Sequence, residues 1–292
     1  MAGAVRRKPV VRAVAILGLG AVGSKLALEL ARSGIPVIAW NRTPRGLPQS
    51  APEIRVVPTL AEAMGAAKEA VLCVADGGLV ELDAQLAELG DSLRPTTVLH
   101  TCGARPPGVL SKLEASGCAT GLFHPLLSVP TGGVVTLRNA RFAVRGAPAA
   151  RALAARLAAQ LGAQTFELEG DDRAQARYHA AASLVSGGTA AVIASGLELA
   201  RDAFQDPSEA RLALAALARS VADNLDILDP EEAATGPIPR GSVELVQQHL
   251  AALEGPERAV YAQVAGLVLK LVAPRLDASA EKLLALAIEQ RK

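Results

Sequence analysis

Short apolar runs alternate with longer amphipathic segments through the first 169 residues. The runs predict buried strands at Ala13–Leu17, Pro36–Trp40, Ile54–Val57, Ala70–Val74, Thr97–Thr101, Ala119–Phe123, Arg141–Val144 and Gln164–Leu168. The segments between them, such as Leu60–Ala67 and Pro148–Leu161, follow a helical period. Strands that alternate with helices predict an α/β domain with a doubly wound, mainly parallel sheet.

The pattern changes near Gly170, and from there helical periodicity continues to the end of the chain. It is interrupted at Gln205–Ser208, Pro230, Gly236–Gly241 and Gly255-Pro256. We therefore expect two domains, residues 1–169 and an all-α domain at 170–292, with a hinge at 169–172. Ala180–Leu197 carries no charge and approaches transmembrane length. Because it lies within a charged helical region, we expect a buried, closely packed helix rather than a membrane span.

A glycine turn joins the first strand to the first helix. It reads Gly18-Leu19-Gly20-Ala21-Val22-Gly23, and a GxGxxG motif between strand and helix predicts a dinucleotide site. Gly18 permits the tight turn, Gly20 lets the backbone approach a pyrophosphate, and Gly23 lets the helix pack closely on the strand. The alternative is a glycine turn that serves packing alone.

The end of the second strand indicates which dinucleotide is bound. NAD sites usually carry Asp or Glu there, whereas this chain has Asn41, followed by Arg42, Thr43 and Arg45. Loss of the carboxylate removes repulsion toward a 2′-phosphate, and an arginine supplies donors that suit phosphate oxygens. We therefore expect NADP rather than NAD. Arg42 as a solvated residue, or as one that stacks on adenine, is the alternative.

Polar groups follow two further strands, where ligands bind in doubly wound sheets. After the fourth strand, Val74-Ala75-Asp76 is expected to flank the cofactor, unless Asp76 only caps the next helix. After the fifth strand, His100-Thr101-Cys102 is placed to contact a nicotinamide or substrate. Nothing in the spacing supplies Cys102 with a base, so we do not expect a catalytic cysteine.

Histidines provide the candidates for proton transfer, because histidine titrates near neutrality. His124 at a strand end is predicted to donate a proton or bind a substrate oxygen, and Ser128 is predicted to orient the substrate at the catalytic site. The alternative for His124 is a histidine that only bonds loop backbone. On the first long helix, Tyr178 and a stripe of His179, Ser183 and Ser186 line a cleft or pack internally.

Arg240 lies in the rigid loop Gly236–Gly241 and either clamps a carboxylate or caps a helix.

Composition narrows the partners and the compartment. The formal net charge of +1 gives no electrostatic case for nucleic acid or an anionic membrane. The cysteines, Cys73, Cys102 and Cys118, are odd in number and lack metal-type spacing, which suits a reduced, cytoplasmic protein without a metal site. Arg6-Arg7-Lys8 precedes an apolar run as in an export signal, but cleavage there would destroy the glycine turn.

Taken together, five motifs resemble one family, which joins a Rossmann-like domain to a domain of unknown function 2520. They are GLGAVG at 18–23, HTCG at 100–103, HPLLSV at 124–129, YHAAASLVSG at 178–187 and GPIPRG at 236–241. The family is similar to 6-phosphogluconate and 3-hydroxyisobutyrate dehydrogenases and to pyrroline-carboxylate and ketopantoate reductases. The resemblance implies a homodimer formed by the C-terminal helices, which close over the nicotinamide.

The chain departs from this pattern in three places. Cys102 stands where the family usually has Ser, and Gly187 where it has Asn. The hydroxyacid dehydrogenases use a lysine on the first long helix, but none lies between Asp171 and Glu198. The proton donor is then His124, Tyr178, His179 or an ordered water.

We expect an NADP-dependent oxidoreductase that transfers a hydride between NADPH and the carbonyl of a small, carboxylate-bearing metabolite. By resemblance, a ketopantoate-like 2-oxo acid is favoured, followed by a cyclic imine of the pyrroline-carboxylate type. The alternative from another class is a non-catalytic, NADP-binding regulatory protein. A deazaflavin cofactor fits less well, because Arg42 suits an adenosine 2′-phosphate.

Overall fold

The computed structural model describes residues 12–43, 54–90, 97–131 and 135–289. The chain divides into two compact units, Met1–Ala182 and Ser183–Lys292. Each is described below by itself.

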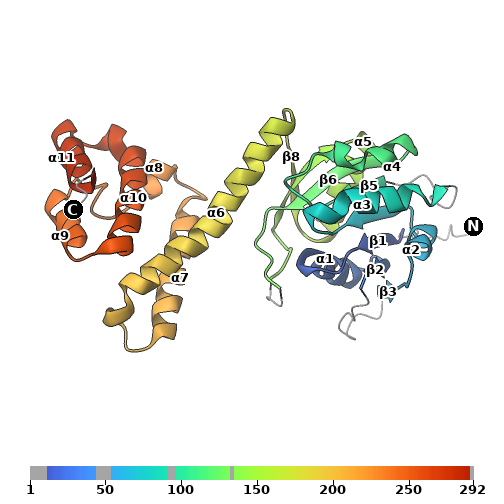
Figure 1. Cartoon of the computed structure of the whole chain (residues 1–292), viewed down its shortest axis with the longest axis horizontal. Coiled ribbons are helices and arrows are strands. Elements are labelled where there is room, and N and C mark those ends of the chain that lie inside the picture. Colours follow the sequence, from blue (N-terminus) through green and yellow to red (C-terminus); the bar gives the residue numbers. More distant parts are fainter. Residues whose placement is uncertain (1–11, 44–53, 91–96, 132–134, 290–292) are drawn as a thin grey trace, which may run out of the picture. The chain divides into compact units, whose positions relative to one another are not determined.

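The described part of the first unit contains one eight-stranded sheet (Figure 1), with strands in the order β3-β2-β1-β4-β5-β6-β7-β8. The strands are β1 (Val14–Leu17), β2 (Val37–Trp40), β3 (Ile54–Val56), β4 (Glu69–Leu72), β5 (Thr97–His100), β6 (Ala119–Pro125), β7 (Arg141–Gly146) and β8 (Gln164–Glu167). All neighbours are parallel except β6 and β7. The predicted α/β class is confirmed. The strand order reverses between β1 and β4, which is where such sheets open a ligand crevice.

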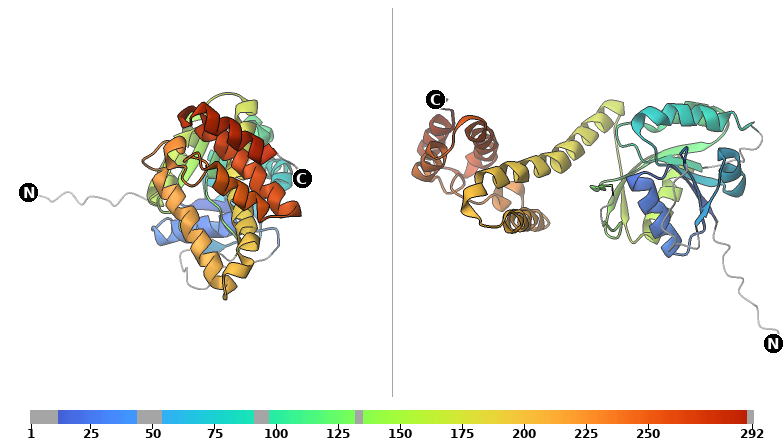
Figure 2. Two further views of the ribbon diagram at one scale, coloured as in Figure 1. Left: turned by 90° about the vertical axis from the view of Figure 1, so that its left-hand side faces the viewer. Right: turned by 60° about the horizontal axis from the view of Figure 1, so that its bottom comes forward.

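Helices cover both faces of this sheet, as the right-hand view of Figure 2 shows. The helices of the unit are α1 (Ala21–Arg32), α2 (Leu60–Ala66), α3 (Asp76–Ala87), α4 (Ser111–Ala115) and α5 (Pro148–Gln160), with a 3-10 turn at Pro107–Leu110. Neighbouring β1 residues point to opposite faces: Ile16 packs with α1 and α5, and Leu17 packs with α2, α3 and α4. Burial on both faces explains why the strands read as continuous apolar runs.

One buried carboxylate links two of these helices. Asp83 of α3 is 2% exposed and accepts hydrogen bonds from the main-chain N–H groups of Lys112 (3.1 Å) and Leu113 (3.0 Å). These groups belong to the first turn of α4, where no intrahelical acceptor exists. Asp83 therefore holds the start of α4 against α3.

The second unit is all-α, as predicted. Its helices are the C-terminal part of α6 (Asp172–Leu199), α7 (Pro207–Asn224), α8 (Pro230–Ala233), α9 (Val243–Ala251), α10 (Gly255–Val272) and α11 (Ala278–Glu289), with 3-10 turns at Arg201–Ala203 and Ala273–Arg275. A small core of Val246, Leu269 and Leu284 joins α9, α10 and α11. The division between the units falls inside α6, so the first turns of α6 belong to the first unit.

Helix α6 corrects one expectation. We predicted that Ala180–Leu197 is buried, but none of the most apolar window of α6 is buried within the chain. Leu184 and Val185 are 74% and 69% exposed, and the buried residue of this helix is Gln175. The core of the second unit is formed by α9–α11 instead. Among the described residues, α6 alone is long and apolar enough to cross a membrane, by length and composition only.

Candidate functional site

The glycine turn packs tightly against the end of β4. Gly18 has φ +106°, and a Cβ atom there would lie 2.5 Å from the carbonyl oxygen of Cys73. A Cβ at Gly23 would lie 1.9 Å from the carbonyl oxygen of Gly18. At Gly20 a Cβ would meet nothing within 4 Å. Packing therefore requires two of the three glycines, while Gly20 leaves open space at the N-terminus of α1, where phosphates bind.

A pocket of about 450 Å³ opens beside this turn, next to the ends of β1, β2 and β4. Its lining consists of Gly18, Gly20, Trp40, Asn41, Arg42, Thr43, Cys73, Val74, Ala75, Gly78, Glu81, Leu82 and Gln85. The structure thus gathers most of the residues predicted to hold a cofactor. Leu19, Ala21, Val22 and Gly23 complete the turn and the start of α1, and Arg45 lies outside the described residues.

Sequence reasoning missed six residues of this lining, namely Trp40, Cys73, Gly78, Glu81, Leu82 and Gln85. Gly78, Glu81 and Gln85 are three and four residues apart, so they share one face of α3. Because α3 follows a strand that we expected to flank the cofactor, this spacing is the signal that would have found them.

Asn41 supports the glycine turn. Its side-chain oxygen accepts a hydrogen bond from the Leu19 N–H (2.7 Å), and its amide nitrogen donates to the carbonyl oxygen of Thr43 (2.6 Å). Arg42 beside it points its guanidinium toward Glu81, with 3.4 Å between Nη1 and Oε2. The Arg42 side chain is 77% exposed, so it is available to a ligand in the pocket.

Cys102 is bound to Asp76 rather than free to react. Its Sγ donates to Oδ1 of Asp76 at 2.8 Å. Burial, reinforced by the hydrogen bond and charge of Asp76, raises the pKa of Cys102 to about 11. The thiol stays protonated at neutral pH, which agrees with the expectation that this cysteine is no nucleophile. Asp76 is the first residue of α3 and ties this helix to the loop after β5.

A histidine–tyrosine pair lies at the carboxyl end of β6. His124 Nδ1 and the Tyr178 hydroxyl are 2.8 Å apart, and the two rings meet edge to face. His179 is the next neighbour, with its ring centroid 5.9 Å from that of His124. Gly103 packs against the His124 imidazole, since a Cβ there would lie 2.7–2.8 Å from three ring atoms. Three segments that are distant in sequence therefore meet at His124.

Burial sets the protonation of this pair. Burial first, and then the charge of His179, lowers the pKa of His124 to about 4. Burial raises the pKa of Tyr178 to about 12. The expectation that His124 titrates near neutrality is therefore wrong, because the enclosed ring disfavours the imidazolium. At neutral pH the pair consists of a neutral imidazole and a protonated phenol.

The last residue of β5 and the loop that follows it lie beside His124, which Gly103 of this loop contacts. The His100 ring is fully buried, and burial lowers its pKa to about 4. Thr101 bonds through its main-chain N–H to the carbonyl oxygen of Leu72 at 3.1 Å. Gln175 of α6 donates to the carbonyl oxygens of Gly103 and Arg105, which fixes the loop. Substrate contact by His100 and Thr101 stays a prediction, and the enclosed His100 ring favours a supporting role.

The remaining predicted residues lie elsewhere. Ser128 is exposed in the loop after β6. Ser183, Ser186 and Arg240 are exposed residues of the second unit, and their roles stay predictions. Over the described ranges, no three His, Cys, Asp or Glu side chains form a metal-binding group.

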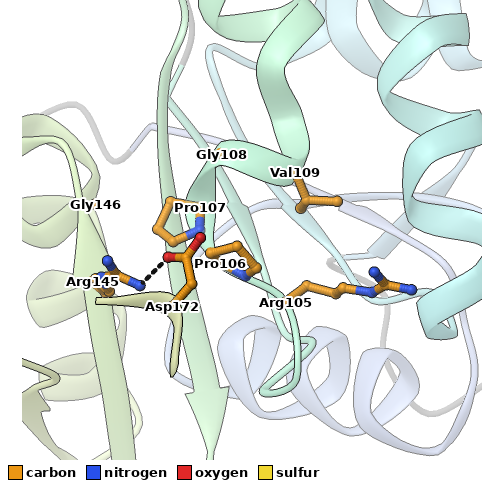
Figure 3. A pocket seen from close by; sticks show the side chains of 8 residues that line it. All are labelled: Arg105, Pro106, Pro107, Gly108, Val109, Arg145, Gly146 and Asp172. Atoms are coloured by element: carbon orange, nitrogen blue, oxygen red, sulfur yellow. Dashed lines mark hydrogen bonds and ion pairs between the residues drawn. The ribbon is translucent and has the colours of Figure 1, made fainter. Parts of the chain in front are cut away.

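Another pocket, of about 640 Å³, lies in the same unit (Figure 3). Its charged residues are Arg105, Arg145 and Asp172. Arg145 is engaged by its own chain, with Nη1 2.9 Å from both Asp172 Oδ1 and Gln175 Oε1. The neighbouring Gly146 pairs with Gly121, near the amino end of β6. The lining of this pocket does not include His124 or Tyr178.

Comparisons with known proteins identify two family models along the chain. The family model described as the NAD binding domain of 6-phosphogluconate dehydrogenase matches residues 13–169, and the domain of unknown function 2520 matches residues 140–267. The comparison with curated proteins gives no match.

Solved structures share the fold over nearly the whole chain. A Bacteroides fragilis protein assigned as an NADP oxidoreductase has a TM-score of 0.69 at 21% identity, covering 88% of this chain and 97% of its own. Plasmodium falciparum pyrroline carboxylate reductase with NADP bound has a TM-score of 0.59 at 13% identity, covering 97% of each chain. An imine reductase from Pseudomonas sp. has a TM-score of 0.56 at 19% identity, covering 93% of this chain and 90% of its own. Because the first family model spans more than half of the residues, the chain belongs to the family of the NAD binding domain of 6-phosphogluconate dehydrogenase.

Proposed function

We propose that this chain is an NADPH-dependent reductase that acts on a C=N or C=O bond of a small, carboxylate-bearing metabolite. One observation carries the proposal. The glycine-turn pocket and the His124–Tyr178 pair lie at the carboxyl ends of parallel strands of one sheet. In doubly wound sheets this edge binds the ligands.

The lining of the pocket favours a phosphorylated adenosine ribose. Asn41 replaces the usual carboxylate, and its side chain is hydrogen-bonded to the main chain of Leu19 and Thr43. Arg42 is exposed at the same rim, and its guanidinium offers paired donors to a 2′-phosphate. The pyrophosphate is assigned to the open space at Gly20 and the N-terminus of α1. A fold shared with a reductase solved with NADP bound supports this assignment.

The histidine–tyrosine pair supplies the proton. NADPH, when bound, supplies a hydride to the carbon of the double bond, and the nitrogen or oxygen then needs a proton. Tyr178 retains its proton at neutral pH because burial raises its pKa to about 12. An Nδ1–H of His124, donated to the phenol oxygen, stabilises the charge that Tyr178 gains as it releases this proton. His124 thereby orients the donor, in place of the helix lysine that this chain lacks.

The double bond is assigned from analogy. Sequence motifs favour a ketopantoate-like 2-oxo acid, while similar structures include a pyrroline carboxylate reductase and an imine reductase. We therefore propose to screen C=N substrates first and 2-oxo acids second. Either substrate requires the same proton donor.

The decisive experiment compares Tyr178→Phe with a matched variant elsewhere. Tyr261 of α10 forms an equivalent bond with His249, at 2.8 Å from its Nδ1, so Tyr261→Phe removes the same hydroxyl far from the sheet edge in sequence. With cyclic imines and 2-oxo acids as substrates, Tyr178→Phe is expected to lower kcat 100-fold or more. The Kd for NADPH, from titration calorimetry, is expected to stay within about twofold, and Tyr261→Phe is expected to retain wild-type kcat.

Two outcomes contradict the proposal. A wild type that binds neither NADPH nor NADH removes the reductase function. A wild type that binds NADPH but reduces no imine or oxo acid supports the non-catalytic, regulatory alternative.

We also propose that a second copy of the chain covers the exposed face of α6. Leu184, Val185 and Val192 are 74%, 69% and 51% exposed on a segment without charges. A contiguous apolar patch of this kind marks an interaction surface, and the resemblance implies a homodimer. Sedimentation is expected to give a dimer for wild type and a monomer for Leu184→Arg, while Val80→Arg, at a 55% exposed position of α3, stays dimeric. A wild-type monomer that cosediments with lipid vesicles contradicts this proposal.

A further inference from the structure

Helix α3 presents a carboxylate to the arginine that we assign to the 2′-phosphate. Leu79, Leu82 and Leu86 anchor α3 in the core on one face of the sheet. This packing turns Glu81 and Gln85 toward the pocket. The position of Glu81 is therefore set by the buried face of the helix and does not depend on a flexible loop.

The contacts of Glu81 hold it against Arg42. Its Oε2 lies 3.4 Å from Arg42 Nη1, and its Oε1 accepts a hydrogen bond from Gln85 Nε2 at 3.1 Å. Gln85 thus orients the carboxylate, which leaves one oxygen for the guanidinium. The Arg42 guanidinium therefore has an anionic partner in its own chain.

A 2′-phosphate must compete with this partner. Its oxygens would take the guanidinium, and its charge would come close to the carboxylate on the same rim. Like charges a few ångströms apart repel, although solvent and salt screen the effect at an exposed site. A ribose 2′-hydroxyl carries no charge and can donate a hydrogen bond to a carboxylate. Glu81 therefore weakens the binding of NADPH and does not hinder the binding of NADH.

We propose that Glu81 is a specificity-determining residue that competes with a 2′-phosphate for Arg42 and narrows the preference for NADPH over NADH. This inference rests on the proposed function, since it requires a dinucleotide in the pocket. Cofactor choice then depends on α3 as well as on the glycine turn and the end of β2.

Titration calorimetry of wild type, Glu81→Gln and Glu81→Lys with NADPH and NADH tests the inference. Glu81→Gln is expected to tighten NADPH about fivefold, roughly 1 kcal/mol, with NADH unchanged or weaker. Glu81→Lys adds a cation at the same place and is expected to tighten NADPH further. Both effects are expected to shrink at about 0.5 M salt, because the charges are exposed.

Glu88→Gln is the matched control. Glu88 is an exposed glutamate next to the C-terminal end of α3 and is not among the pocket-lining residues. It is expected to leave both Kd values unchanged. If the ratio of NADPH to NADH affinity in Glu81→Gln stays within about twofold of the wild-type ratio, this inference is overturned but the proposed function is not. A wild type that binds neither nucleotide overturns both.

Discussion

Gly20 and Gly23 of the turn have different roles, and an alanine substitution at each position distinguishes these roles. Gly20 precedes α1 with φ −72° and ψ −165°, a conformation open to alanine, and its Cβ would meet nothing within 4 Å. Gly23 lies inside α1, where a Cβ would lie 1.9 Å from the Gly18 carbonyl oxygen and 2.8 Å from Cys73 Cβ. Gly20→Ala therefore tests the ligand, and Gly23→Ala tests the packing.

The magnitudes follow from these distances. For Gly20→Ala, alanine is a poorer N-cap residue than glycine, but it lowers the conformational entropy of the unfolded chain. These two effects offset each other, so the free energy of unfolding is expected to change by less than about 0.5 kcal/mol. NADPH affinity is expected to fall about tenfold or more, since the methyl stands where the pyrophosphate approaches. For Gly23→Ala, the clash involves backbone on one side, so the cost is expected to reach about 3 kcal/mol. In a unit of this size, that lowers the melting temperature by roughly 10 °C.

The assays are thermal unfolding by circular dichroism and NADPH titration by calorimetry. Gly65→Ala is the control, because Gly65 in α2 also has nothing within 4 Å and lies outside the pocket. It is expected to bind NADPH as wild type does and to raise the melting temperature by a few degrees at most, because alanine is favoured over glycine in a helix. Gly20→Ala that binds NADPH as tightly as wild type refutes the pyrophosphate assignment. Gly23→Ala with an unchanged melting temperature refutes the packing argument.

Further variants test the proton-donating site and the fold. Gly103→Ala pushes the His124 ring away and is expected to lower kcat at least tenfold in steady-state assays, whereas an unchanged kcat contradicts the assigned geometry. Because burial lowers the pKa of His100 and His124 to about 4, the unfolded chain binds more protons between about pH 6.5 and 4. The free energy of unfolding, measured with urea, is thus highest above about pH 6.5 and falls toward pH 4, by up to about 3 kcal/mol per histidine. His124→Gln is expected to flatten this profile, and an identical slope speaks against it. Asp83→Ala leaves two buried N–H groups without an acceptor and is expected to cost about 2–4 kcal/mol in urea unfolding, against a smaller loss for Asp83→Asn; equal losses rule out the capping role.

Local pattern was sufficient to predict much of this molecule. All eight strands were predicted from apolar runs, because a parallel sheet covered on both faces needs such runs. The glycine turn, Arg42 and the strand-end position of His124 are equally local, since turn chemistry and strand ends are written in adjacent residues. The C-terminal helices followed from their helical period and from its interruptions, such as Gln205–Ser208 and Gly255-Pro256.

Long-range contacts decided the rest. His124 bonds Tyr178 across 54 residues, and Arg42 meets Glu81 across 39. Such pairs depend on strand order and helix rotation, which no local period encodes. The exposure of α6 also depended on where other helices packed.

The sequence by itself determined the elements, the nucleotide turn and the polar groups at the strand ends, because these depend on residues close in the chain. Only the tertiary structure decided that His124 is neutral, that Asn41 holds the turn and that Glu81 faces Arg42. Protonation and pairing arise from burial and from charges on distant segments, and these exist only once the chain has folded.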